Sequence, residues 1–408
     1  MKCRHCKTEL DIEFLDLGNA PPSNAYLRPE DLRKPEVTYP LRVLTCSNCW
    51  LVQTEDYAGS GELFNDTYAY FSSTSQGWLN HAAAYCEMIT ERLKLNTNSF
   101  VVEIASNDGY LLKNFVQANI PCLGIEPTKS TAVAAEALGV PVRQEFFGEG
   151  FAQKMADAGE HADLVIGNNV YAHVPDINDF TRGIATVLKE NGVVTFEFPH
   201  LLRLIEQTQF DTVYHEHFSY LSLSVVQSIF AAAGLRVFDV EELSTHGGSL
   251  RVYGCLTAAG HEETSNVSRT VSGEISFGLQ NADTYTTFQT KANAVKDGLV
   301  RFLLDAKADG KSVAGYGAAA KGNTLMNYAG IRPDLMPFVC DAAEAKIGQY
   351  LPASHIPILH PSSLLENRYD YIVIFPWNIA SEVMRVNQAL ADQGTKFVVA
   401  VPELKVIL

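Results

Sequence analysis

The stretch "VVEIASNDGYLL" (Val101–Leu112) joins an apolar, β-rich run to a polar turn with one glycine, and the start of a helix follows. The same alternation continues downstream, where runs of β-branched and aromatic residues are separated by segments with helical spacing of apolar residues. The predicted strands are Phe100–Ala105, Cys122–Pro127, Ala162–Asn169 and Gly192–Pro199, and the predicted helices include Thr131–Gly139 and Asn178–Gly192. Strands that alternate with helices form βαβ units, so we predict an α/β protein with a parallel, doubly wound sheet.

The polar turn in this stretch is a candidate cofactor loop. It does not have the G-x-G-x-x-G spacing of a dinucleotide-binding turn, which argues against NAD. An acidic residue, small residues and then Asn-Asp-Gly is the form of this turn in methyltransferases that use S-adenosylmethionine (SAM). There the chain passes close to the methionine part of the cofactor, and Gly109 has no Cβ that would block it.

Two later strand ends extend the predicted cofactor site. Glu126 ends the next strand, where a carboxylate can accept hydrogen bonds from both ribose hydroxyls. The segment "GNNVYAHVPD" (Gly167–Asp176) follows a further strand, at the carboxyl edge where ligands bind in open α/β sheets. We therefore predict a SAM pocket, with the candidate residues Glu103, Asn107, Gly109, Tyr110, Glu126, Asn168 and Asn169.

Four of the eight cysteines form two CxxC pairs near the start of the chain, at Cys3, Cys6, Cys46 and Cys49. Two such pairs in a small, Pro-rich module with little core predict a structural Zn²⁺ site. A redox-active CxxC or incidental thiols are the alternatives, and His5 could compete as a ligand. A site closed by four thiolates has no open position for a substrate, so we assign it no chemistry.

The composition limits the organisation and the partners of the chain. A length of 408 residues predicts two or three domains, for which we expect the ranges 1–62, 63–257 and 258–408. A formal net charge of −16 argues against a nucleic-acid partner. The sequence has no apolar run of about 18 residues and no apolar region in its first residues. We therefore expect no membrane partner and a location in the reducing cytoplasm.

A polar break, His261–Glu274, separates the first α/β pattern from a second and smaller one, and it reads as a linker or a surface loop. The second pattern begins with a long helix over residues 286–310. Its predicted strands are Ser312–Ala318, Met336–Asp341, Tyr371–Phe375 and Lys396–Pro402.

The glycine-rich turn "GYGAAAKGNTLMNY" (Gly315–Tyr328) lies in this second pattern. Backbone amides at a helix start and Lys321 could seat a diphosphate, although the P-loop spacing is missing and the turn could be purely structural. Asn323 and Trp377 are further candidates for binding substrate, and so is His246 in the strand-forming segment Ser244–Gly254.

The segment "FDTVYHEHFSYLSLS" (Phe210–Ser224) places two histidines, a glutamate and two tyrosines within Tyr214–Tyr220, in a turn or short helix before a predicted helix. A metal site, a general base with helpers and a polar surface turn are three interpretations. A general base needs one imidazole whose partner sets its tautomer, and Glu216 or a backbone carbonyl could do this.

Taken with the CxxC pairs, the motifs "LGNAPPSNAYL", "FNDTYAYFSS", "EIASNDGYLL", "NNVYAHVPD", "VYHEHFSY", "HGGSLRVY" and "YGAAAKGNTLMNY" resemble those of the nucleotide-sugar C-methyltransferases along essentially the whole chain. This family includes the tetronitrose C-3 methyltransferase. The resemblance implies a small zinc-binding domain, a central SAM domain and a C-terminal Rossmann-like domain that completes the sugar-nucleotide site.

The resemblance also implies a reaction and a set of residue roles. The substrate would be a keto deoxysugar nucleotide, dTDP-linked and methylated at C-3, with inversion at the methyl carbon. His217 would remove the proton next to the carbonyl, and Tyr214 and Glu216 would orient it or contact the sugar. His173 and Tyr68 would flank the substrate and help to polarise or protonate the keto oxygen. His215 has no clear role, and the chain could act as a monomer or a homodimer.

Two other functions compete with this prediction. The chain could be an O- or N-methyltransferase that acts on another small molecule, or a non-catalytic protein that binds sugar nucleotides. Only C-methylation requires removal of a proton from carbon, so exchange of solvent deuterium into the unmethylated sugar separates these possibilities.

Overall fold

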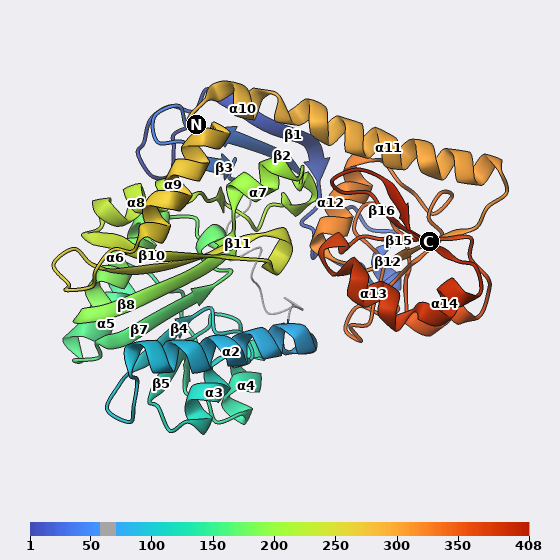
Figure 1. The fold of residues 1–408 in the computed structure, drawn as a ribbon. Helices are drawn as coiled ribbons and strands as arrows, with labels where there is room; N and C mark the ends of the chain where they lie inside the picture. Colours follow the sequence, from blue (N-terminus) through green and yellow to red (C-terminus); the bar gives the residue numbers. More distant parts are fainter. Residues whose placement is uncertain (58–70, 408) are drawn as a thin grey trace.

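A seven-stranded sheet forms the middle part of the chain in the computed structural model, which describes residues 1–57 and 71–407 (Figure 1). Five of its strands are parallel: β4 (Val101–Ile104), β5 (Cys122–Ile125), β6 (Val142–Arg143), β7 (Ala162–Asn168) and β8 (Leu188–Pro199). The order is β10-β11-β8-β7-β4-β5-β6, and β10 (Leu235–Leu243) and β11 (Ser249–Leu256) form an antiparallel hairpin at one edge. The predicted doubly wound α/β fold is confirmed, with this hairpin added.

Helices cover both faces of the central sheet (Figure 1). One face packs against α2 (Gln76–Leu93), α3 (Leu112–Gln117) and α4 (Lys129–Ala137), and the other against α5 (Glu149–Asp157), α6 (Ile177–Val187) and α8 (Leu223–Ala232). The middle strand β4 is buried on both sides, because Val101 belongs to the first core and Val102 to the second. This is why the run is apolar at every position except Glu103.

Two predicted segments differ in the structure. The helix expected over Asn178–Gly192 ends at Val187, and β8 begins directly at Leu188. Most of the polar break lies in the helix α9 (Ser265–Phe277), which packs on α8 and β10. It is polar because its exposed face dominates the composition, while Val267, Thr270 and Glu274 form the buried face at helical spacing.

The N-terminal region forms an antiparallel four-stranded sheet of β1 (Ile12–Ala20), β2 (Tyr39–Thr45), β3 (Val52–Thr54) and β9 (Ser219–Tyr220). The last strand does not come from the N-terminal region. It comes from the segment that carries the histidine cluster, between α7 (Leu201–Glu206) and α8. The zinc-binding region therefore shares one sheet with the segment that carries the predicted base.

The C-terminal region is a second, six-stranded sheet in the order β14-β13-β12-β15-β16-β17. Its strands are β12 (Val313–Tyr316), β13 (Val339–Cys340), β14 (Ile358–Leu359), β15 (Tyr371–Ile374), β16 (Lys396–Val399) and the antiparallel β17 (Lys405–Ile407). This is the strand order of a Rossmann-like unit, as expected. The helices α12 (Ala320–Tyr328), α13 (Ala380–Val386) and α14 (Gln388–Asp392) accompany it (Figure 1).

Helix α11 (Phe288–Ala308) follows α10 (Ala282–Thr286) and runs along both the N-terminal sheet and the C-terminal unit (Figure 1). One continuous hydrophobic core connects these regions, and the ring of Phe14 on β1 stacks on Phe288 with 4.5 Å between centroids. Among the described residues, no helix is both long enough and apolar enough to cross a membrane.

Candidate active site and metal centre

The two CxxC pairs come together in space although about forty residues separate them. The four Sγ atoms lie within 4.8 Å of one another, with 3.6 Å between Cys3 and Cys49 and 3.4 Å between Cys6 and Cys46. Tetrahedral Zn²⁺ with Zn–S bonds of about 2.3 Å requires Sγ atoms about 3.8 Å apart, so this donor set fits a structural zinc ion. The imidazole of His5 bonds Asn178 at 2.8 Å and is not one of the clustered donors.

The carboxyl ends of β4 and β7 form the switch point of the central sheet, because the chain leaves β4 toward β5 and returns to the other side for β7. Three residues other than glycine adopt left-handed backbone conformations there: Ala105 (φ 55°), Asn107 (φ 49°) and Asn169 (φ 53°). Such strained conformations concentrate where a backbone must approach a ligand closely. The predicted cofactor turn therefore lies at the edge expected for SAM.

The first cofactor turn is held in shape by carboxylate and amide side chains. Glu126 accepts hydrogen bonds from the backbone N–H of Asn107 and of Thr128, both at 2.9 Å. Each carboxylate oxygen keeps a lone pair for a further donor, as binding ribose hydroxyls requires. Asn107 in turn accepts from the amide of Ser72 at 2.9 Å, which ties the turn to the segment that precedes α2.

The structure gives a second reason for glycine at position 109, besides the close approach of the cofactor expected from sequence. Its φ of +76° lies in the left-handed region, and an added Cβ would stand 3.0 Å from the Cβ of Ala135 on α4 and 3.2 Å from Val140. The missing side chain thus makes room for the packing of α4. Any contact of Gly109 with the cofactor would be through its backbone.

Several buried polar side-chain atoms at this edge lack hydrogen-bond partners among the described residues, and the candidate residues Asn168 and Glu103 carry some of them. Both amide atoms of Asn168, the last residue of β7, have none. Glu103 Oε2 also has none, and burial, reinforced by Glu126 and Asp108, raises the pKa of Glu103 well above its usual value. Unpaired donors and acceptors at a switch point are what a polar ligand can satisfy, so these residues fit SAM. Tyr110 is buried beside them.

A group of polar and aromatic side chains on α2 and β8 lies next to the cofactor turn, and it was not predicted from the sequence. Trp78 stacks on His81 (4.9 Å), lies 6.1 Å from Tyr110 and is 5.3 Å from His246. The imidazole of His246 bonds Asn169 Nδ2 at 3.3 Å. Trp78 therefore lies across the switch point, between the turns that follow β4 and β7.

Buried Glu197 on β8 connects the elements of this group. Its carboxylate bonds His81 at 2.8 Å, Arg251 at 2.9 Å and the hydroxyl of Thr245 at 2.9 Å. Burial raises its pKa, but these partners outweigh burial and the net pKa is lowered. A glutamate inside a predicted strand is the one sequence signal that could have indicated this group.

His217 has the geometry of a general base. Its Nδ1 lies 2.9 Å from the carbonyl oxygen of Thr212, and a carbonyl can only accept, so Nδ1 carries the proton and Nε2 has a free lone pair. Burial lowers the pKa of His217 well below 6.5, and His173 adds to this effect. The imidazole is therefore neutral at pH 7. Of the two partners predicted for it, the backbone carbonyl is the one observed.

His173 and Tyr214 lie against His217. The His173 ring meets it edge-on with 4.6 Å between centroids, and the Tyr214 ring lies at 4.0 Å. His173 Nδ1 lies 2.8 Å from the carbonyl oxygen of Glu216, so the same tautomer applies, and burial lowers its pKa to about 4. In this tautomer Nε2 of the neutral His173 carries no proton.

The other members of the cluster face away from His217 in their observed hydrogen bonds. Both carboxylate oxygens of Glu216 accept from Asn24 Nδ2, at 2.8 and 2.9 Å. These bonds attach the loop between β1 and β2 (residues 21–38, the N-terminal loop) to the segment that carries His217 (residues 210–222, the base segment). His215 Nε2 lies 3.2 Å from the carbonyl oxygen of Pro40 on β2. Tyr68, predicted to flank the substrate, lies outside the described residues.

The C-terminal unit brings a charged wall to this region. The amine of Lys321 lies 4.8 Å over the Trp377 ring and donates to Asn378 at 2.7 Å. The positive charge of Lys321 helps to lower the pKa of His217 and of His246. Trp377 Nε1 donates to buried Asp211 at 2.8 Å, and burial raises the pKa of that carboxyl to about 6.

Asn323, predicted to bind substrate, forms a hydrogen bond inside the protein. It is buried on α12, and its Nδ2 donates to the carbonyl oxygen of Ser23 at 2.6 Å. Neighbouring Thr324 donates to the carbonyl oxygen of Val213 at 2.9 Å. Both residues attach α12 to the N-terminal loop and to the base segment.

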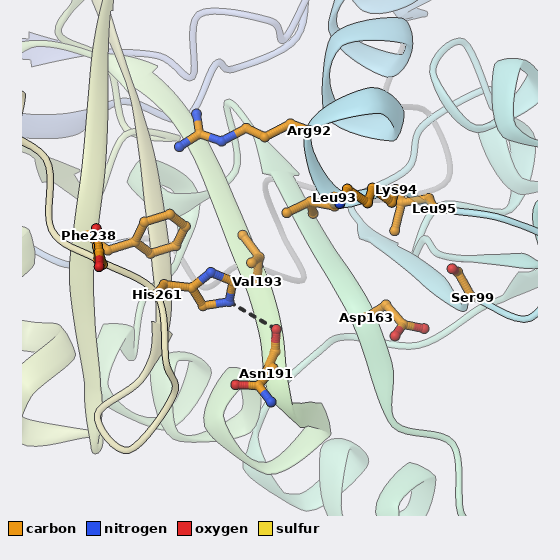
Figure 2. Close-up of a pocket in the computed structure, with 11 residues that line it drawn as sticks. Arg92, Leu93, Lys94, Leu95, Ser99, Asp163, Asn191, Val193, Phe238 and His261 are labelled. Atoms are coloured by element: carbon orange, nitrogen blue, oxygen red, sulfur yellow. Dashed lines mark hydrogen bonds between the residues drawn. The ribbon is translucent and has the colours of Figure 1, made fainter.

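A cavity of about 360 Å³ lies elsewhere, between the end of α2 and β10 (Figure 2). Arg92, Phe238 and His261 line it, and His261 bonds the carbonyl oxygen of Asn191 at 3.0 Å. Asp163, at the start of β7, also lines it, so the cavity lies at the amino ends of the parallel strands. This is the opposite edge from the one where ligands of such sheets bind.

Comparison with known proteins agrees with this arrangement. Family models match three successive parts of the chain: a zinc binding domain over residues 3–64, a methyltransferase domain over 78–240 and a C-methyltransferase C-terminal domain over 244–402. With the fold, they define a SAM-dependent methyltransferase that carries a zinc-binding domain. The chain is 33% identical over 406 residues to the C-methyltransferase NovU of Streptomyces niveus, with 100% of this chain and 96% of that protein covered. It therefore belongs to this family of SAM-dependent C-methyltransferases.

Solved structures of methyltransferases are similar to part of the chain. A Haloferax volcanii methyltransferase in complex with its Trm112 activator is 13% identical, with a TM-score of 0.37 and coverage of 44% of this chain and 92% of that chain. The magnesium protoporphyrin IX methyltransferase of Synechocystis PCC 6803 with bound SAM is 14% identical, with a TM-score of 0.32 and coverage of 44% and 78%. The family assignment rests on the full-length relative.

Proposed function

We propose that this C-methyltransferase acts on a keto deoxysugar nucleotide, dTDP-linked and methylated at C-3, with His217 as the base. The observation that carries the proposal is the buried, neutral imidazole of His217, whose tautomer is fixed by the Thr212 carbonyl. A base of this kind is what a C-methylation needs and what methyl transfer to an amine or to an acidic hydroxyl does not require. The cytoplasm remains the proposed location.

The first step of the proposed reaction is the removal of a proton from the sugar. His217 Nε2 removes the C–H proton next to the sugar carbonyl, and the electron pair moves onto the keto oxygen to form an enolate. The resulting imidazolium keeps its Nδ1–H bond to the Thr212 carbonyl, which stabilises the added charge. SAM bound at the candidate residues would supply an activated methyl group to the enolate carbon with inversion at the methyl carbon, and the S–CH3 bond would break to leave a neutral thioether.

The enolate oxygen needs a hydrogen-bond donor or a nearby positive charge. His173 is proposed to flank the substrate, because its ring lies against His217. The Tyr214 hydroxyl is our preferred donor, because its ring lies against His217. Lys321 on the C-terminal unit is proposed to hold the anionic diphosphate through its charge, with the ring of Trp377 packed against its amine.

The decisive experiment measures proton removal directly. The unmethylated keto-sugar nucleotide is incubated in D₂O without SAM, and deuterium entry at C-3 is followed by NMR. His217→Asn is expected to abolish exchange and methylation while SAM affinity stays within about twofold of wild type. His215→Asn is the matched control, because that imidazole lies in the same loop but contacts Pro40.

Wild-type exchange in His217→Asn would overturn the base assignment. The substrate itself is tested by incubating dTDP-, CDP-, GDP- and UDP-linked keto sugars with SAM and looking for the mass gain of one CH₂ unit. Methylation of a substrate that lacks a carbonyl next to the reacting carbon would contradict the enolate route.

A further inference from the structure

The loop that carries the first two zinc-ligand cysteines also contacts the segment that carries the proposed base. Arg4 lies between Cys3 and Cys6 in this loop (residues 3–6, the zinc loop), and it is buried. Its guanidinium points away from the thiols and into the junction between the N-terminal sheet and the methyltransferase domain. An arginine this deeply buried is unusual unless all its donors are paired.

All five N–H donors of the Arg4 guanidinium have acceptors. Nε donates to the carbonyl oxygen of Phe218 at 3.2 Å, and Nη1 donates to the carbonyl oxygen of Pro175 at 3.0 Å. Nη2 donates to the carbonyl oxygen of Thr54 at 3.0 Å, and Asp56 accepts from both terminal nitrogens. A planar guanidinium reaches this many fixed acceptors at once, and an ammonium group with three donors does not.

Two of these acceptors are next to the imidazoles of the proposed site. Phe218 directly follows His217, and Pro175 lies two residues after His173. The Arg4 guanidinium also lies 5.0 Å from the Phe218 ring centroid. One side chain of the zinc loop therefore contacts both segments that carry the two stacked imidazoles.

The N-terminal sheet adds to this attachment. Strand β9 pairs with β3, the Thr54 amide donates to the Phe218 carbonyl at 3.2 Å, and Thr54 Oγ1 donates to the carbonyl oxygen of His217 at 3.1 Å. Asn178 at the start of α6 bonds the zinc loop through its amide, at 2.9 Å to the His5 carbonyl. The zinc loop thus connects three parts of the methyltransferase domain.

We propose that Arg4 is a positioning residue, which uses the rigid zinc loop to fix His217 and His173 in register for proton removal. The inference rests on the proposed function in assigning the base to His217. Arg4 touches neither substrate nor cofactor in this role. Displacing a catalytic group by about 1 Å can cost about a hundredfold in rate, so a small shift of the base segment is enough.

The test compares Arg4→Gln and Arg4→Lys with wild type in the full-length, zinc-loaded enzyme. Both variants are expected to lose tenfold or more in the rate of deuterium entry into the keto sugar without SAM, with KM for the sugar within about threefold. Lysine keeps the charge but not the fork, so it should not rescue the rate. Arg42→Gln is the matched control, because Arg42 lies on β2 of the same sheet and pairs only with the acidic residues Glu13, Asp16 and Glu55 among the described residues.

A structural readout separates positioning from loss of the zinc loop. Hydrogen–deuterium exchange of the peptides over residues 212–222 and 171–177 should rise in the Arg4 variants, while zinc content stays at one ion per chain and SAM affinity is unchanged. Unchanged protection of both peptides, or an unchanged rate of sugar deuteration, overturns the inference.

The His217→Asn variant distinguishes a failure of the proposed function from a failure of the inference about Arg4. If His217→Asn retains sugar deuteration, the base assignment is wrong whatever the Arg4 variants do. If His217→Asn loses deuteration but both Arg4 variants keep it, the base stands and the positioning role of Arg4 does not.

Discussion

At the scale of single residues, the environment of His217, the proposed base, should determine how the enzyme responds to pH. Two features act together: burial lowers its pKa, and the Thr212 carbonyl leaves Nε2 unprotonated. His173, stacked edge-on against it, has a pKa lowered to about 4 by burial. The pair is therefore neutral, and ready to accept a proton, over the whole physiological range.

The pH dependence of kcat/KM follows from this. A base is active when deprotonated, so activity is lost only as the pH falls below its pKa, and kcat/KM reports the free enzyme. We expect kcat/KM to stay flat from pH 8 to pH 6.5 and to fall only well below pH 6.5. The measurement is a pH profile of kcat/KM with the methylated product quantified by mass spectrometry. An acid limb centred at pH 6.5 or higher would contradict the observed environment of His217.

A comparison of Gly109 with Gly159 separates the effect of side-chain packing from the effect of the backbone conformation. Gly109 and Gly159 share a φ of +76°, but a Cβ would meet Ala135 at 3.0 Å in the first case and no atom within 4 Å in the second. Gly159→Ala should cost about 1 kcal/mol of stability through the backbone alone. Gly109→Ala should cost more and should weaken SAM binding, because the turn after β4 must move away from α4.

Thermal unfolding and calorimetric titration with SAM test the comparison. Equal losses of stability in both variants with unchanged SAM affinity would show that the packing against Ala135 does not shape the cofactor turn.

At the scale of elements, short-range patterns were readable from the sequence and long-range pairing was not. The strand–turn–helix unit around Val101–Leu112 is local, so β4, its turn and α3 could be predicted. Strand β9 has only two residues, and it is a strand because β3 lies beside it, more than 160 positions earlier in the chain. No local propensity encodes such a partner.

The same distinction applies within the site. The four cysteines and the acidic residue Glu126 carry their chemistry in their residue types, so spacing indicated them. The carbonyl of Thr212 sets the tautomer of His217, but every residue has a carbonyl, and its position depends on the fold. Trp78 was missed because an aromatic residue on an amphipathic helix usually belongs to a core, and only the placement of α2 brings it to the switch point.

Helix α9 shows an element fixed by one buried carboxylate. Glu274 accepts from His200 Nε2 at 2.8 Å and from the backbone amides of Leu223 at 2.6 Å and Ser224 at 2.9 Å. The two amides begin helix α8, where their donors would otherwise be unpaired and where negative charge is favourable. Burial raises the pKa of Glu274, but the bonds to His200 and Ser224 outweigh it and the net pKa is lowered.

Glu274→Gln is expected to destabilise the protein by about 3 kcal/mol, because it breaks a buried ionic hydrogen-bond network and leaves partners unsatisfied. A carboxylate with a lowered folded-state pKa stabilises above its unfolded pKa of about 4.3 and loses that effect as the pH falls further. The difference from wild type should therefore be large at pH 7 and shrink below pH 4. Thermal midpoints at both pH values test this, with exposed Glu263→Gln as the control.

At the scale of the whole molecule, the proposed site is assembled from all three regions. The central domain supplies the cofactor edge and the base segment, the N-terminal sheet pairs with that segment through β9, and the C-terminal unit adds Lys321 and Trp377. The N-terminal loop connects them, because Asn24 bonds Glu216 and Ser23 bonds Asn323. The zinc-binding region is therefore part of the framework of the site, although its metal has no open coordination position.

Removal of zinc should impair proton removal from the sugar while leaving SAM binding nearly unchanged. The candidate SAM residues lie at the carboxyl ends of β4, β5 and β7 and in the turns that follow, whereas His217 adjoins the N-terminal sheet through Thr54 and Arg4. A double variant Cys3→Ser and Cys6→Ser should lose the metal, and structural zinc sites contribute folding free energy directly. We expect methylation and sugar deuteration to fall at least a hundredfold, while SAM affinity changes by less than about threefold. Metal analysis, calorimetric titration with SAM and the deuteration assay measure the three quantities on one preparation.

The stacking of Phe14 on Phe288 and the core that surrounds it should keep β1 attached to α11 without the metal, so the lost order should be confined to the cysteine loops, β3 and β9. Cys86→Ser and Cys340→Ser are controls for thiol loss, because these cysteines are buried far from the cluster in sequence and are not among the clustered donors. Full methylation by zinc-free protein would show that β3 and Arg4 hold the base segment unaided. A parallel loss of SAM binding would instead mean that the metal supports the entire central domain, through the hydrophobic core that Cys3 and Cys46 share with Val102 and Ile104 of β4.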